Sequence, residues 1–296
     1  MTTTRDSAAP PGSLGPAALN GLKLLVFSAL VAGAWAGVGW LLGGARVALL
    51  FLFAALLVGV AVVLHAERLL IAMLGAREVP VGELPQVHSA LERLAARARV
   101  PKPRLYAIDD AHLRSFAAGT GPRRSGIAFT TALLTTAPRE EIEGLLAHEL
   151  AHIRRRDVAV QTLVTLLSMT ILEVSRLGWR AQGVLLYVLG PIAASFPNAF
   201  ISPAREHRAD AYAAWLTEAP LGLAGALLRL ELAAEAVAFA ENPATAPIYA
   251  VNPFDVDDRL AALFDLHPPV GERVRHLRAL AVAAGAPAAP GLDPPS

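Results

Sequence analysis

The chain has 296 residues, of which 54% are hydrophobic and only 17% are charged, and its mean hydropathy is +0.47. Soluble globular domains have roughly 45–50% apolar and about 25% charged residues, so this composition argues against a soluble enzyme and against a disordered or fibrous chain. The formal net charge of +1 gives no basic surface for nucleic acid, and no nucleic-acid partner is expected. The lack of cysteine excludes disulfides, cysteine zinc ligands and a cysteine nucleophile.

Two long apolar runs without charge lie near the N-terminus, at Leu24–Leu42 and Val47–Leu64. A helix rises about 1.5 Å per residue, so each run reaches close to the roughly 30 Å thickness of the hydrocarbon layer. The sequence therefore predicts an N-terminal tail over residues 1–22 and a transmembrane hairpin over residues 23–64. The alternatives are a buried hairpin of a soluble protein and a cleaved signal peptide. Both apolar runs are longer than either alternative requires.

A polar region follows over residues 65–157. Its pattern predicts a helix at Val87–Arg99, short strands at Arg104–Ile108 and Gly126–Thr130, and a strong helix at Pro138–Arg156. Thr136 is the expected N-cap of that last helix, with Pro138 and Glu140 in its first turn.

Two weaker apolar runs make a second hairpin over residues 158–201. Val158–Leu172 is uncharged but carries polar side chains, and Gly183–Ile201 is uncharged but contains Pro191 and Pro197. The pair either spans the membrane, with kinks covered by neighbouring helices, or enters it only partly.

The chain is polar again over residues 202–281, and residues 282–296 are expected to be a disordered tail. The expected elements are helices at Glu206–Trp215, Leu221–Ala240 and Val270–Ala281, with a Pro- and Asp-rich linker at Asn242–Asp258. The predicted fold class is mainly α with a small β-sheet, in a membrane protein with about four transmembrane helices and one polar domain built from residues 65–157 and 202–281.

The basic residues at the ends of the apolar runs predict an orientation. With four spans, one side would carry Lys23, Arg68, Arg77, Arg154, Arg155, Arg156, Arg205 and Arg208, and the other Arg46, Arg176 and Arg180. The richer side is expected to be cytosolic, so both termini and the polar domain would face the cytosol.

The motif His148-Glu149-Leu150-Ala151-His152 lies inside the predicted helix at Pro138–Arg156. Histidines four residues apart share one helix face, so both imidazoles can reach one metal ion. Glu149 is rotated by one residue and can contact a water on that ion. The alternative is an amphipathic helix whose histidines face solvent.

A catalytic zinc site usually has three protein ligands and leaves a fourth position for water. Glu206 is the best candidate for the third ligand, and Asp210, four residues later, can accept an N–H from a ligand histidine and fix its tautomer. Both carboxylates can also be read as solvated charges beside Arg205 and Arg208. His207 is a rival ligand, but it points about 100° away from Glu206.

Together these motifs resemble the HtpX-type membrane zinc metalloproteases, bacterial relatives of the CAAX prenyl endopeptidases. The resemblance runs from the first apolar run to His276. The motifs that carry it are H-E-L-A-H at 148–152, E-x-x-A-D at 206–210, N-P-A-T-A at 242–246 and H-P-P-x-x-E-R at 267–273.

The resemblance implies that one zinc ion is held by His148, His152 and Glu206, that Glu149 is the general base, and that His267 and Arg273 stand near the metal and can stabilise the oxyanion. The alternative for His267 and Arg273 is a structural role, as a helix cap and in a surface salt bridge. The chain departs from the family pattern at Ser115-Phe116-Ala117-Ala118, where the family usually has Asn-Ala-Phe-Ala; at His207, where a Phe or Tyr is usual; and at Pro247, where a His is common. None of these differences removes a ligand.

The implied function is a zinc metalloendopeptidase of the bacterial inner membrane that cleaves unfolded or damaged membrane proteins in protein quality control. Its partners would be polypeptide substrates and the lipid bilayer. We expect the peptide to pair with the strand at Gly126–Thr130. The alternatives are a regulatory antirepressor protease of the BlaR type and a zinc-stabilised scaffold without activity; H-P-P-x-x-E-R favours the HtpX reading, and Glu149 argues against the scaffold, since a structural zinc site needs no base.

Overall fold

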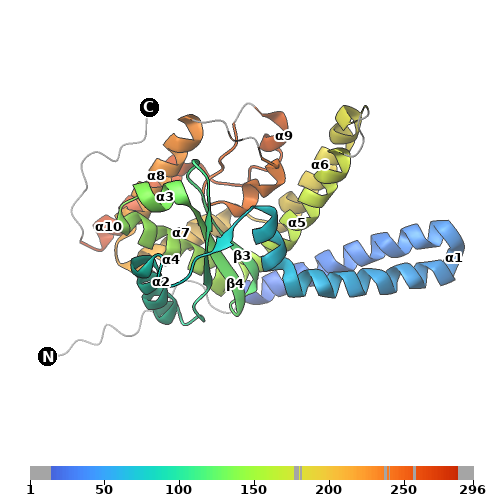
Figure 1. Ribbon diagram of the computed structural model, residues 1–296, viewed down its shortest axis with the longest axis horizontal. Helices are drawn as coiled ribbons and strands as arrows, with labels where there is room; N and C mark the ends of the chain where they lie inside the picture. Colours follow the sequence, from blue (N-terminus) through green and yellow to red (C-terminus); the bar gives the residue numbers. More distant parts are fainter. Residues whose placement is uncertain are drawn as a thin grey trace.

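The computed structural model describes residues 15–176, 180, 182–236, 239, 241–255 and 258–285. A small β-sheet lies between two groups of helices, and one long helical hairpin projects from this body (Figure 1). The expected tails at residues 1–22 and 282–296 fall mostly outside the described residues. The observed architecture agrees with the predicted class of a mainly helical protein with a small sheet.

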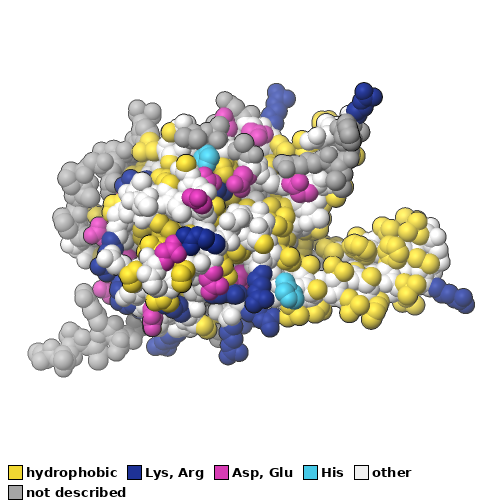
Figure 2. Space-filling model, in the orientation of Figure 1, with side chains coloured by type: hydrophobic (Ala, Val, Ile, Leu, Met, Phe, Trp, Pro, Cys, Tyr) yellow, Lys and Arg dark blue, Asp and Glu magenta, His cyan; other side chains and the backbone are white. Residues whose placement is uncertain are grey.

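The projecting hairpin is α1, Gly15–Met73, whose two halves join at Gly43 and Gly44. Gly44 has φ of 70°, a backbone conformation that glycine adopts without steric cost. A Cβ on Gly39 would lie 2.8 Å from the carbonyl oxygen of Val47, so the two halves approach closely beside the turn. Hydrophobic side chains cover the outside of the hairpin (Figure 2), as expected for a segment in contact with lipid.

Two further apolar helices pack beside each other, α5 at Asp157–Arg176 and α6 at Gln182–Phe200. Among the described residues, α1, α5 and α6 are long and apolar enough to cross a membrane. The most apolar part of α5 is 72% buried inside the protein, against 28% for that of α6. The buried polar side chains of α5, Thr162, Thr165 and Ser168, therefore lie within the protein and not against lipid.

The sheet has four strands in the order β1-β2-β4-β3. Their bounds are Arg77–Glu78, Arg104–Ile108, Ser115–Gly121 and Arg124–Thr130 for β1 to β4. β2 pairs with β4 in parallel and β4 pairs with β3 antiparallel. The two predicted strands are confirmed, but β4 is an interior strand with both edges occupied, so the expectation that a peptide pairs with Gly126–Thr130 is wrong.

The side chains of each strand point alternately to the two faces of the sheet, and each face packs on its own hydrophobic core. Leu105, Ile127 and Phe129 join the core formed with the helices of the polar part. Tyr106 and Phe116 join the core formed with α1, α5 and α6. The sheet thus separates the polar helices from the apolar helices.

The helices of the polar part mostly follow the sequence prediction. Their bounds are Pro85–Ala98 for α2, Thr131–Thr136 for α3, Arg139–Arg155 for α4, Ala204–Thr217 for α7, Pro220–Ala236 for α8, Arg259–Ala262 for α9 and Val270–Ala283 for α10. Thr136 does not cap α4: it ends the unpredicted helix α3, and Pro138 occupies the N-cap position of α4. The expected end of α8 at Ala240 lies outside the described residues.

The first half of the expected linker at Asn242–Asp258 is a buried element. A 3₁₀ helix, η2, runs over Pro243–Ile248, and the side chain of Asn242 accepts a hydrogen bond from the N–H of Ala244 at its start. Ala244, Thr245 and Ala246 are fully buried. The Pro-rich composition that indicated a linker here instead makes a compact segment packed against α5.

Two glycines set the approach of α8 to α4. A Cβ on Gly144 would lie 2.7 Å from the backbone nitrogen of Leu223, and a Cβ on Gly222 would lie 2.5 Å from the carbonyl oxygen of Glu140.

Gly144→Ala and Gly222→Ala should each destabilise the protein by about 1–3 kcal/mol through overpacking, although alanine has the higher helix propensity. Thermal unfolding of the full chain measures this, and Gly183→Ala, with open space around its Cβ, is the control. An unchanged midpoint in both variants would contradict the packing.

Candidate metal centre and active site

The motif helix α4 is buried over its C-terminal half. From Gly144 to Ile153 every residue is buried, and Leu145, Leu146 and Leu150 pack into the core shared with α7 and α8. Because this helix is fixed on several sides, the directions of its histidine side chains are fixed as well. The second helix of the site is α7, which packs against α4 and carries Glu206 in its first turn.

The structure brings His148, His152 and Glu206 into one cluster. The Nε2 atoms of the two histidines lie 3.2 Å apart. Glu206 Oε2 lies 3.3 Å from His148 Nε2, and Glu206 Oε1 lies 3.6 Å from His152 Nε2. One ligand atom from each residue lies within 4.8 Å of the others, and all three residues are buried. Among the described residues this is the group that has the chemistry and spacing to hold a metal ion.

The outer nitrogen of each histidine faces a second carboxylate. Asp210 Oδ1 lies 3.0 Å from His148 Nδ1, and Asp157 Oδ2 lies 3.5 Å from His152 Nδ1. A carboxylate at Nδ1 favours the tautomer that leaves Nε2 free to bind a metal. Asp210 lies beside a ligand histidine, as expected from the sequence, whereas the position of Asp157 was not predicted.

Arg273 is a buried cation that binds this carboxylate network. Its Nε and Nη2 each donate to Asp210 at 2.8 Å, and its Nη1 donates to the carbonyl oxygen of Ala250 at 2.5 Å. Nη2 also lies 3.5 Å from Glu206 Oε2. Arg273 is therefore close to the ligand cluster, as the resemblance implied, but most of its donors are already used in holding Asp210 and Ala250.

Glu149 lies beside the cluster without joining it. Its Oε1 accepts a 2.9 Å hydrogen bond from the Ser115 hydroxyl at the start of β3. Burial raises the pKa of Glu149 above its ordinary value, although His148 and His152 oppose this shift. A carboxylate with a raised pKa is better suited to accept a proton at neutral pH than an exposed glutamate.

The carboxylates of the cluster favour positive charge at its centre. Burial favours the neutral ring of His148, but Asp210 and Glu206 outweigh it and raise the pKa of His148 to about 9. Burial also favours the neutral acid at Asp210, yet Arg273 and His148 outweigh it and lower the pKa of Asp210 to about 2. The pKa of Glu206 is likewise held well below its ordinary value, against burial, by His152 and Arg205.

The donor set fits a divalent metal. Neither carboxylate oxygen of Glu206 has a hydrogen-bond partner among the described residues, although the side chain is fully buried. Arg205 and Arg273 lie 3.0 and 3.5 Å from these oxygens and supply positive charge, but a buried carboxylate without a hydrogen bond stays costly, and a bound cation would compensate it further. Two imidazole nitrogens and one carboxylate that converge on one point supply such a site.

His267 and His207 lie outside the cluster. The Nε2 of His267 donates to the carbonyl oxygen of Tyr249 at 2.9 Å, and its Nδ1 lies 3.3 Å from Asp265. His207, the rival ligand, is partly exposed and lies 3.4 Å from Glu272. Its position agrees with the expectation that it points away from Glu206.

Sequence reasoning missed two residues of the site, Asp157 and Ser115. Asp157 follows Arg156, which has φ of 62° and turns the chain sharply between α4 and α5. The sequence carries no clear signal for that turn. Ser115 could have been found, because it occupies the first position of the segment where this chain departs from the Asn-Ala-Phe-Ala pattern.

Comparison with known proteins gives the family. Residues 83–281 match peptidase family M48. A protease HtpX homologue from Pelotomaculum thermopropionicum is 33% identical over 89% of this chain and 100% of its own length, and one from Acidiphilium cryptum is 37% identical over 88% and 96%. The crystal structure of S. mikatae Ste24p aligns over 90% of this chain and 66% of its own, with 17% identity and a TM-score of 0.46. A family match that spans the motif helix, α7 and Arg273, together with HtpX relatives of nearly the same extent, shows that the chain belongs to peptidase family M48 as an HtpX-type membrane metalloprotease.

Proposed function

We propose that the protein is a zinc-dependent endopeptidase that cleaves unfolded or damaged membrane proteins at the cytosolic surface of the bacterial inner membrane. The observation that carries the proposal is the buried convergence of His148, His152 and Glu206, with the Glu149 carboxylate beside them. The relatives named as HtpX proteases favour this function over a scaffold that only uses zinc for stability.

Zinc is the proposed metal because of the donor set. Three protein ligands of nitrogen and oxygen type, with one position left for water, are typical of catalytic zinc. His148, His152 and Glu206 would be those ligands, and Asp210 and Asp157 would orient the histidines. When bound, the metal would polarise the scissile carbonyl and lower the pKa of the attacking water.

Glu149 is the proposed group for both proton transfers of the hydrolysis. We assign its carboxylate to take a proton from the attacking water and to pass it to the leaving amine. The Ser115 hydroxyl, which donates to Oε1, holds the carboxylate in place and leaves Oε2 for the water. The oxyanion role of His267 and Arg273 stays a prediction, and the contacts of Arg273 add a second role, the orientation of Asp210.

The proposed substrate path lies along β3. It is the edge strand of the sheet, and its first residue contacts Glu149. Tyr249 forms a bridge with Phe116 on this edge, and the N–H of Ala250 donates to Ser115. A peptide that pairs with β3 beside Glu149 would have to displace this segment, which requires an extended, unfolded substrate.

The first prediction concerns the base. Glu149→Gln should retain the metal and lower turnover by about 10²–10⁴, because a positioned acid–base group contributes that much. Cleavage of an unfolded protein by the purified full chain, with and without chelator, measures it. Glu140→Gln, an exposed glutamate on the same helix, is the matched control. Wild-type turnover in metal-loaded Glu149→Gln would refute the assignment.

The second prediction concerns the third ligand. Glu206→Ala should lose the metal, because two histidines leave the coordination sphere half empty. Asp210→Ala should lose about 10–100-fold in metal affinity or activity, as is common when a partner of a ligand is removed. Bound zinc per chain is measured by elemental analysis.

His207→Ala is the control for this pair of variants, since it removes the neighbouring side chain outside the cluster and should keep the metal. The reverse pattern, an empty site in His207→Ala and a full site in Glu206→Ala, would show that the ligand is misassigned.

The third prediction concerns topology, which rests on the basic residues at the helix ends. The chain has no cysteine, so single cysteines can be introduced without background. Cysteine at Arg123, exposed beside β4, should react with an impermeant reagent only after cell lysis, and cysteine at Arg46, beside the α1 turn, should react in intact cells. Reaction at position 123 from outside would overturn the cytosolic placement.

A further inference from the structure

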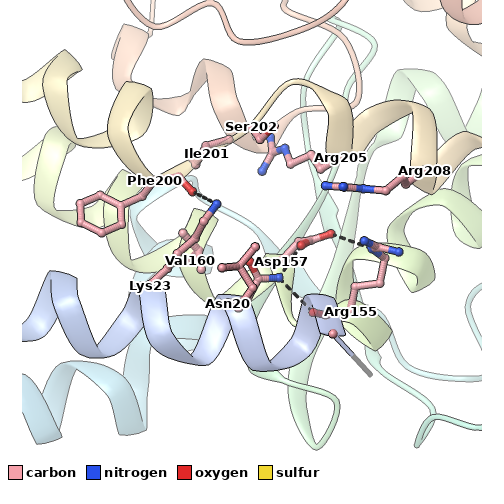
Figure 3. A pocket seen from close by; sticks show the side chains of 12 residues that line it. Asn20, Lys23, Arg155, Asp157, Val160, Phe200, Ile201, Ser202, Arg205 and Arg208 are labelled. Atoms are coloured by element: carbon pink, nitrogen blue, oxygen red, sulfur yellow. Dashed lines mark hydrogen bonds and ion pairs between the residues drawn. The ribbon is translucent and has the colours of Figure 1, made fainter. Parts of the chain in front are cut away.

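A polar cavity of about 350 Å³ lies beside the metal cluster, where the first residues of α1 meet the α4–α5 and α6–α7 junctions (Figure 3). It shares Asp157 and Arg205 with the surroundings of the cluster but is not lined by His148, His152 or Glu206. The start of α1, the start of α5 and the end of α6 all border it. These are the three apolar helices of the described chain. The cavity therefore lies at the level where the membrane-crossing segments would end and the polar part begins.

The lining of the cavity is strongly basic. It contains Lys23, Arg155, Arg205 and Arg208, against the single carboxylate of Asp157. Figure 3 shows Arg205 and Arg208 extending from α7 toward the space above Asp157, with Lys23 reaching up from α1 on the other side. Asp157 already accepts a 2.6 Å hydrogen bond from Asn20. Arg205 is also paired with Glu206, which leaves the one carboxylate of Asp157 to face the charges of Lys23, Arg155 and Arg208.

The cations have donors that the described residues do not satisfy. Arg155 is only 6% exposed, and its Nη2 has no hydrogen-bond partner among those residues, while its Nε lies 3.5 Å from Asp157. Lys23 donates one hydrogen bond, 2.8 Å long, to the carbonyl oxygen of Phe200, and an ammonium group has three to give. A buried guanidinium with an unpaired donor, such as that of Arg155, is costly, and half-buried Lys23 has further donors to offer, so the cavity is short of anionic oxygens.

We propose that this cavity binds the phosphate group of an anionic phospholipid, such as phosphatidylglycerol. A phosphodiester supplies several charged acceptor oxygens to a cluster of Arg and Lys, which forms charge-assisted hydrogen bonds with it. Leu19, which lines the cavity and is 54% exposed, continues into the apolar surface of α1, along which acyl chains can lie. Basic pockets between membrane helices on the cytoplasmic side are suited to such headgroups.

The site rests on the proposed membrane insertion of α1, α5 and α6. A bound headgroup would join α1 to α7, the helix that carries Glu206. Arg205 connects the cavity to the metal cluster, because it lines the cavity and its Nε lies 3.0 Å from Glu206 Oε1. A lipid would thereby hold the metal-ligating helix at a fixed height relative to the bilayer.

Calorimetric titration of the full-length Glu149→Gln chain in a nonionic detergent tests the site without substrate turnover. The probes are short-chain phosphatidylglycerol, short-chain phosphatidylcholine and inorganic phosphate. Phosphatidylglycerol should bind saturably and more tightly than the other two. Lys23→Gln and Arg208→Gln should each weaken its binding about tenfold, the loss of one hydrogen bond to a charged group.

Arg68→Gln is the matched control, because it removes the same charge from an exposed position on α1 outside the cavity. It should weaken binding less than about fivefold, the contribution of a basic residue that is merely near an anionic surface. Zinc content and the thermal midpoint of each variant verify that it is folded.

Three results would overturn the proposal. They are equal binding of phosphatidylcholine, binding of inorganic phosphate as tight as that of the lipid, and equal losses in Arg68→Gln and the two cavity variants. Failure of the broader functional proposal is separate: an inactive wild-type chain that binds phosphatidylglycerol refutes the peptidase, and extraction by alkaline carbonate refutes the insertion.

Discussion

The contact between α4 and α7 is the interaction on which the site depends. It places the carboxylate of Glu206 against the Nε2 atoms of His148 and His152 in a fully buried position. Removing these groups from water costs free energy that ion pairs alone repay poorly. A divalent cation bound between them would offset that cost, so the same burial favours the proposed metal binding. Arg273 and Asp210 extend the same network one layer outward.

The sheet and the turn after α4 connect this site to the membrane part. One face of the sheet packs on the polar helices and the other on the apolar helices, and β3 at its edge supplies Ser115 to Glu149. The left-handed residue Arg156 turns the chain from α4 directly into α5, which returns Asp157 to His152. The residues proposed for catalysis therefore lie within a few residues of an apolar helix. This layout supports the proposal that the protease acts on membrane-protein substrates.

Much of this arrangement could be predicted from local patterns. The apolar runs, the motif helix and the strands at 104–108 and 126–130 have strong periodic or compositional signals, and they occur where expected. The third ligand could be narrowed to Glu206 but not settled without the resemblance, because no local rule relates residues 54 positions apart (206 − 152 = 54).

The failures have physical causes. β3 is rich in Gly and Ala, which are poor strand formers, so its sequence hides an edge strand that tertiary packing creates. A sequence that gives no signal for β3 leaves β4 as an apparent edge strand. The proline content of Pro243–Ile248 is typical of a linker, yet the carbonyl oxygen of Pro247 accepts hydrogen bonds from two buried side chains, those of Arg205 and Gln161. Its order comes from partners distant in the sequence.

The central claim is that His148, His152 and Glu206 together hold the catalytic metal. Anomalous diffraction at the zinc edge from crystals of the metal-loaded Glu149→Gln chain tests it most directly. The account predicts one peak at about 2.0–2.2 Å from the two Nε2 atoms and a Glu206 oxygen. A peak coordinated by other residues, or zinc held by the histidines with Glu206 turned away, would contradict it.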